Sequence, residues 1–313
     1  MSNNQGSYRS EFKLDTRQPP HRLTEEHCMA KHSQIQDIGR DRDEQVRIEF
    51  PTTNGRTTSA IYTVSVFHPH ADLVILRDKI QKLLHYCQLS NTNTCEGEVK
   101  AQIMIDGLNE EKARESGELI EDLRDDGQNR KLVVIAPHGG NVEEYTDKQA
   151  EYVVNQFSYD RVSLWICKGF SSKGGSDAFE RWHITSTEIS EKSFPKLNTI
   201  FGRAFEYSIA FHGWTKDNIC VGGRKDNKTV DKLKVEIRDA IHNTLKELGC
   251  NIQVNVSGCP ECSEGFNGDS EDNIVNRLGT NGIQIEQCKM AREKYHENIA
   301  EAVAKTIRPW INM

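Results

Sequence analysis

The chain has 313 residues, which is enough for one large domain or for a domain with a smaller attachment. Charged residues make up 28% and hydrophobic residues 36%, a balance typical of a globular protein with some disordered sequence. The net charge of -7, from 40 basic and 47 acidic residues, argues against a nucleic-acid-binding protein, which normally carries a basic surplus.

The chain shows no signal for membrane insertion or export. No apolar run approaches the roughly 20 residues that cross a bilayer. The N-terminus also lacks the apolar stretch of a secretory signal. We therefore predict a cytoplasmic protein without a membrane partner, with release by a phage or non-classical route as the alternative.

The nine cysteines argue against a disulfide framework, because their number is odd and no export signal accompanies them. Most of them are predicted to be buried thiols that pack as small hydrophobic side chains. Cys259 and Cys262 form a CxxC motif, and no second CxxC is present. A structural metal or a redox pair at this motif is the alternative to ordinary loop cysteines.

The N-terminal part carries no motif that we can attach to chemistry. Residues 1–45 are polar and without periodicity, which predicts a disordered tail. Residues 46–125 are predicted to form an accessory region or an extension of the main sheet. The elements expected there are strands at Val46–Phe50 and Ser59–Phe67, a helix at Leu73–Tyr86, a turn-rich break at Asn91–Glu98 and a helix at Glu110–Arg124.

Residues 126–313 have the pattern of an α/β domain. Leu132–Ala136 is a continuous apolar run, which is typical of a strand buried on both faces. Further strands are predicted at 163–167, 207–211, 219–221, 251–256 and 282–286, with helices from about 146, at 230–248 and at 291–307. The alternation predicts a mixed, largely parallel central sheet with helices on both faces.

Two polar residues follow the first of these buried strands. His138 and Glu143 are separated by a short loop that contains two glycines. Such a loop can turn both side chains onto one ion, and zinc accepts neutral imidazole and carboxylate ligands. A strand-ending turn with a solvated glutamate is the alternative for this segment alone.

A second strand also ends in a histidine followed by glycine, at His212 and Gly213. The common form predicts that His138 and His212 lie on one edge of the sheet. His183 competes for the place of third ligand, but it opens an apolar segment instead of ending one. We therefore favour His212 as the ligand and place His183 in the pocket wall.

The last predicted strand ends at Glu286, and Gln284 lies on the same face because side chains alternate along a strand. A carboxylate there is suited to act as a general base on a metal-activated water. Arg277, shortly before this strand, is a candidate to hold a substrate carboxylate or a developing oxyanion. An exposed strand face and a surface arginine are the alternatives.

Taken in order, these segments resemble the poly-γ-glutamate hydrolase family of phage-type zinc enzymes, which is related in fold to carboxypeptidase A. The resemblance rests on the following segments of this chain: 136–143, 182–186, 211–213, 221–224, 276–277 and 282–286. It implies a zinc ion on His138, Glu143 and His212, with Glu286 as the catalytic glutamate. We also predict a substrate pocket that includes Arg224, Asn276, Trp182 and His183.

The predicted activity is therefore zinc-dependent hydrolysis of γ-glutamyl amide bonds in an anionic, peptide-like substrate, with Arg277 or Arg224 at the oxyanion. One alternative is a zinc amidase or deacylase acting on another small acyl amino acid or peptide. A non-catalytic binding protein with a retained fold is the second. A serine hydrolase is disfavoured because no GxSxG motif is present. The oligomeric state does not follow from the sequence.

Overall fold

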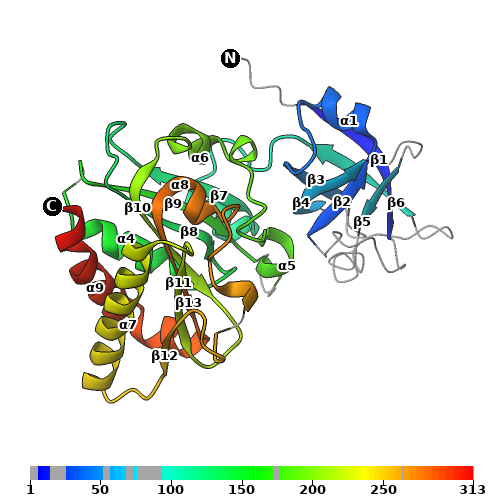
Figure 1. The fold of residues 1–313 in the computed structure, drawn as a ribbon. Helices are drawn as coiled ribbons and strands as arrows, with labels where there is room; N and C mark the ends of the chain where they lie inside the picture. Colours follow the sequence, from blue (N-terminus) through cyan, green and yellow to red (C-terminus); the bar gives the residue numbers. More distant parts are fainter. Residues whose placement is uncertain are drawn as a thin grey trace. The chain divides into compact units, whose positions relative to one another are not determined.

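The computed structural model describes residues 6–14, 26–51, 57–67, 73–76, 94–158, 160–171, 177–262 and 264–312. The chain divides into two compact units, shown in Figure 1. Unit 1 contains Met1–Leu119 and Ser171–Pro195, and unit 2 contains Ile120–Phe170 and Lys196–Met313. The segment 171–195 therefore lies between the two sequence segments of unit 2 but belongs to unit 1.

Unit 2 is built on a seven-stranded sheet in the order β12-β11-β13-β10-β8-β9-β7. The strands are β7 (Leu119–Arg124), β8 (Leu132–Gly140), β9 (Val162–Gly169), β10 (Phe205–Gly213), β11 (Ile219–Gly223), β12 (Val254–Val256) and β13 (Gly279–Gln287). β8, β9, β10 and β13 run parallel, and β11 is antiparallel to β13. The predicted mixed, largely parallel sheet is confirmed.

Helices cover both faces of this sheet. One face packs against α4 (Thr146–Asn155), α7 (Lys228–Glu247) and α9 (Lys289–Ile311), with which it forms one apolar core (Figure 1). The other face contacts α8 (Ile274–Leu278) at β10 and β13. Unit 2 also contains the 3-10 helix η3 (Glu264–Phe266) and most of α6 (Pro195–Ile200).

The alternation of side chains along β10 and β13 prepares the functional edge. Phe211 and Ile285 belong to the core that packs against α4, α7 and α9. His212 and Glu286, one residue further along, point to the opposite face. Because parallel strands finish at the same edge, the polar ends of β8, β10 and β13 are brought together.

Unit 1 contains a closed sheet in the order β1-β5-β2-β4-β3-β6. Its strands are β1 (Ser7–Leu14), β2 (His27–Ala30), β3 (Gln45–Pro51), β4 (Thr57–Phe67), β5 (Leu73–Leu76) and β6 (Thr94–Lys100). The other elements are α1 (His32–Asp37), α3 (Glu110–Ser116), α5 (Ala178–Trp182) and the 3-10 helix η2 (Glu191–Ser193). Ile48, Tyr62 and Val99 lie at the centre of its core.

The prediction of a disordered tail over 1–45 is wrong for its described residues, which form β1, β2 and α1. The signal was missed because these strands pair with partners distant in sequence. Ser7–Lys13 of β1 pairs with β6, more than 80 residues later, and Glu11–Leu14 pairs with β5. Such long-range pairing leaves no local periodicity of its own.

The helices predicted at Leu73–Tyr86 and Glu110–Arg124 are also corrected. Leu73–Leu76 is strand β5, and residues 77–86 lie outside the described residues. The second segment divides at Gly117, whose left-handed φ of 72° ends α3 before β7 begins. The break predicted at Asn91–Glu98 contains most of β6, from Thr94 onward.

A disulfide joins Cys220 of β11 to Cys262, which corrects the prediction of an ordinary loop thiol for Cys262, whereas Cys259 is a free thiol. The parallel pairing of β11 with β12 carries the chain after Val256 back toward Cys220, although 42 residues separate the two cysteines. Trp214 and Cys259 pack against this disulfide.

Within the described part of the chain, every helix is too short or too polar to pass through a lipid bilayer.

Candidate metal centre

A tight loop at the end of β8 brings Glu143 back to His138. The Glu143 N–H donates to the His138 carbonyl at 2.8 Å, which closes the loop. Gly140 adopts a left-handed φ of 71°, and a Cβ there would lie 2.6 Å from the Gly169 carbonyl of β9. The glycine is therefore required by both the turn and the close approach to β9.

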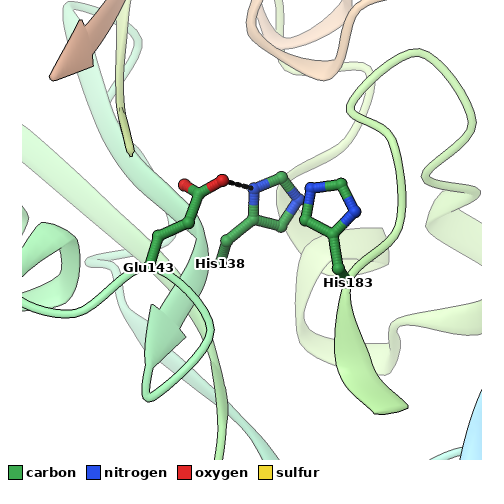
Figure 2. A group of neighbouring side chains, drawn as sticks. All are labelled: His138, Glu143 and His183. Carbon is green, nitrogen blue, oxygen red and sulfur yellow. Dashed lines mark hydrogen bonds and ion pairs between the residues drawn. The ribbon is translucent and has the colours of Figure 1, made fainter. Parts of the chain in front are cut away.

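Three ligand-type side chains converge at this edge of the sheet. Nδ1 of His138 lies 3.1 Å from Oε1 of Glu143, and Figure 2 shows the ring and the carboxylate facing each other. Nδ1 of His212 lies 3.3 Å from Oε2 of Glu143 and 3.2 Å from Nδ1 of His138. All three side chains are buried.

These distances fit a shared divalent ion. Zinc bonds of about 2.0–2.2 Å at tetrahedral angles place ligand atoms about 3.3–3.6 Å apart, close to the separations found here. Each Nδ1 carries at most one proton and the carboxylate carries none, so at most two protons are available for three contacts and hydrogen bonding alone does not account for all of them. Two imidazoles and one carboxylate also form a donor set used by catalytic zinc sites.

The electrostatics favour the protonation states that a metal needs. Burial raises the pKa of Glu143, but the two imidazoles outweigh burial and hold this pKa well below its usual value. Burial lowers the pKa of His212. The Gly213 N–H, which donates to Oε2 of Glu143 at 2.9 Å, supports the same ionised carboxylate. Burial thus favours the neutral form of His212, which is the form that binds a metal, and Glu143 stays ionised.

Glu286 stands beside this cluster. It is paired in register with His212 across the parallel strands β10 and β13. Burial raises its pKa well above the usual value, and the negative charge of Glu143 raises it further. Gln284 donates from Nε2 to Oε1 of Glu286 at 2.8 Å and accepts from Nδ2 of Asn273 at 2.8 Å.

Trp182 and His183 belong to unit 1. His183, also drawn in Figure 2, forms an ion pair with Glu26 and stacks on Phe179 at 4.4 Å between ring centres. The guanidinium carbon of Arg181 lies 4.4 Å from the ring centre of Trp182, which is buried. Both predicted pocket residues thus have contacts within their own unit.

The contacts described for the two predicted arginines are with other residues than the three candidate ligands. The Arg224 N–H bonds to the carbonyl of Gly282, four residues before Glu286, or roughly 13 Å along an extended strand. The guanidinium of Arg224 donates to the Asn276 carbonyl, and Arg224 lines a cavity of about 820 Å³. Arg277 lies 4.8 Å from the ring centre of Phe201.

The Asn276 side chain connects two carbonyls of the loop before α8, because its Nδ2 donates to the carbonyls of Gly268 and Ser270 at 2.7 Å each.

The structure also adds Asn273 and Arg292 to the surroundings of the site. Neither carries a signal in a single sequence, since an asparagine at a helix cap and an arginine in a helix are both common.

A family model described as Poly-gamma-glutamate hydrolase matches residues 107–308. The UPF0714 protein YmaC of Bacillus subtilis (strain 168) is 26% identical over 171 residues, which cover 54% of this chain. The match spans about three fifths of the length of that relative, at 61%.

Three solved structures are similar at lower levels. A bacteriophage poly-gamma-glutamate hydrolase has a TM-score of 0.44 and 22% identity, over 62% of this chain and 90% of its own. Zinc-free YndL has a TM-score of 0.46 and 19% identity, over 61% of this chain and 89% of its own. A metallo-carboxypeptidase from Pseudomonas aeruginosa has a TM-score of 0.38 and 12% identity, over 87% of this chain and 81% of its own. Similarity at these TM-scores does not bear on function.

Proposed function

Since the chain belongs to the poly-γ-glutamate hydrolase family, as its ordered motifs predicted, we propose that it hydrolyses γ-glutamyl amide bonds with zinc as cofactor. The observation that carries the proposal is the convergence of His138, Glu143 and His212 within 3.1–3.3 Å, beside Glu286. A buried carboxylate that faces two buried imidazoles is the kind of group that binds a cation in proteins.

In this proposal His138, Glu143 and His212 hold the metal. When bound, zinc supplies a Lewis acid that lowers the pKa of water to about 7 and polarises the substrate carbonyl. The Gly213 N–H keeps the Glu143 carboxylate in place by donating to it at 2.9 Å. Phe211, the residue before His212, is buried in the apolar core on the other face of the sheet.

Glu286 is proposed as the general base. Its raised pKa, caused by burial and by Glu143, makes the carboxylate a better proton acceptor than an exposed glutamate. Glu286 would take a proton from the attacking water and return it to the leaving amine. The hydrogen bond from Gln284 orients the carboxylate for both steps.

The substrate is proposed to be an anionic, peptide-like chain with γ-glutamyl links. Arg224 and Arg277 are the proposed contacts for its carboxylates or for the oxyanion, and His183, Trp182 and Asn276 remain proposed members of the pocket. If these arginines bind carboxylates, replacing Arg224 or Arg277 by alanine raises KM more than it lowers kcat.

The test combines one variant with a substrate panel. Glu286→Gln should retain the metal content of the wild type and lose about 100-fold or more of the hydrolysis of poly-γ-glutamate. Wild-type protein should cleave γ-glutamyl peptides and leave α-glutamyl peptides of equal length intact. Cleavage of other acyl amino acids alone would instead support a different amidase, and metal binding without any hydrolysis would support a binding protein.

A further inference from the structure

Arg292, in the first turn of α9, has a buried guanidinium directly behind the candidate site. Its side chain is only 8% exposed. Nη1 donates to the carbonyl of Glu144 at 2.6 Å, and Nε donates to the carbonyl of Gln287 at 3.4 Å. A single side chain thus bridges the loop after β8 and the end of β13.

These two carbonyls flank the residues of the site. Glu144 follows Glu143, and Gln287 follows Glu286. The Gln287 carbonyl also accepts the N–H of Trp214 at 3.0 Å, two residues after His212. Arg292 therefore contacts the backbone next to Glu143 and next to Glu286. It also shares the Gln287 carbonyl as an acceptor with the N–H of Trp214, which follows the end of β10.

The guanidinium also lies against Gly213. A Cβ at position 213 would lie 2.4 Å from Cζ of Arg292 and 2.5 Å from its Nε. The absence of a side chain at Gly213 thus leaves room for the guanidinium beside the residue that follows His212.

We propose that Arg292 is a positioning residue, which fixes Glu143, His212 and Glu286 relative to one another by bridging the backbone beside them. The inference rests on the proposed function. A planar guanidinium donates in two directions at once, whereas the ammonium of a lysine is a single charged point on a flexible stem. The two hydrogen bonds from the guanidinium of Arg292, and not its positive charge alone, are what fixes the three side chains in this proposal.

The experiment compares Arg292→Ala and Arg292→Lys with the wild type. Both variants should lose about 10- to 100-fold in kcat and in zinc affinity, measured by chelator competition, while KM changes less than about 2-fold. Arg308→Ala is the matched control, because Arg308 lies on the same helix and donates to a backbone carbonyl, that of Gln156, away from the site. The control should match the wild type in all three quantities.

Gly213→Ala gives a second test that retains the arginine. The added methyl group should displace the guanidinium and reproduce the losses of Arg292→Ala in kcat and zinc affinity. In the Arg292→Ala background the same methyl group should add little, because the space is then empty. Gly213→Ala by itself, which retains the arginine, keeps the proposal testable if Arg292→Ala fails to fold, and the non-additivity of the two changes is a further check where both variants fold.

Three outcomes would overturn the proposal: unchanged zinc affinity and kcat in Arg292→Ala, a rise in KM alone, and full rescue by lysine. A wild-type protein that hydrolyses no γ-glutamyl substrate contradicts the proposed function instead. In that case the zinc affinities of the variants still decide whether Arg292 positions the ligands.

Discussion

Glu143 shows how single side chains define the chemistry of this protein. Its two carboxylate oxygens face two different imidazoles, at 3.1 and 3.3 Å, and one of them also accepts the Gly213 N–H. These contacts keep the carboxylate ionised despite burial. Glu286, on the neighbouring strand, has the opposite shift, because it is buried and repelled by Glu143. Two buried glutamates thus differ in the direction of their pKa shift because of their surroundings, which suits them to the different roles proposed for them.

At the residue scale we predict the effect of Gln284→Leu. Leucine removes the 2.8 Å hydrogen bond that orients Glu286. The value of kcat should fall about 10-fold, as for other residues that support a metal site, while zinc content stays at the wild-type level. Steady-state kinetics with metal analysis checks this. Equal kcat in variant and wild type would show that Glu286 needs no such support.

The sequence predicts the ligands for a physical reason. His138 and His212 each end an apolar run and precede glycine, so the end of a parallel strand could be assigned to both. Arg292 could not be found in this way, because its carbonyl acceptors are backbone groups. Arg224 and Arg277 show the reverse: their type suggested substrate contacts, yet the contacts described for them are with Asn276 and Phe201.

At the scale of elements, an ion pair connects the ends of three strands of unit 2. Asp125, just after β7, accepts two hydrogen bonds from Arg203 at 2.6 and 2.7 Å. It also accepts the hydroxyl of Ser163 in β9 at 2.6 Å. Burial raises the pKa of Asp125, but these donors outweigh it and the pKa is lowered.

We predict that Asp125→Asn lowers the free energy of unfolding by about 1.5–3 kcal/mol at pH 7, the range for hydrogen bonds to a charged group. A lowered pKa in the folded state contributes stability above the unfolded value of about 3.8. That contribution is lost as the pH falls through the folded pKa. The difference between the two proteins in urea titrations should therefore be constant from pH 7 to about pH 5 and narrow as the pH falls below 3.8, and a gap that does not narrow there would contradict this assignment.

Elements were predictable where the pattern was local. The strands β8 to β13 and the helices α4, α7 and α9 agree with the predictions from apolar runs and helical periodicity, whereas the short helices α5, α6 and α8 were not predicted. In unit 1 the pairing is between distant segments, such as β1 with β6, so β1 and β2 were missed. The break at Gly117, between α3 and β7, was hidden within a charged segment.

At the scale of the whole molecule, the family match covers residues 107–308, which include most of unit 2 and the inserted segment 171–195. The closed sheet of unit 1 lies outside the match. The candidate ligands His138, Glu143 and His212 and the proposed base Glu286 all belong to unit 2, on strands of one sheet or in the loop after β8.

The disulfide provides a prediction for the stability of unit 2. The bond between Cys220 and Cys262, at a sequence separation of 42, lowers the conformational entropy of the unfolded chain, which stabilises the folded state by about 4 kcal/mol in the loop-entropy description. The double variant Cys220→Ala with Cys262→Ala should unfold at lower denaturant concentration than the wild type. Cys250→Ala, at a free thiol, serves as the control. A double variant as stable as this control would show that the bridge contributes nothing.

The most direct measurement is the zinc content of purified protein, determined by elemental analysis for the wild type, Glu286→Gln and His212→Ala. The account predicts about one zinc per chain in the first two proteins and almost none in the third, because His212 supplies a ligand and Glu286 does not. Full zinc occupancy in His212→Ala, or a wild-type protein that hydrolyses its substrate at full rate without any metal, would contradict it.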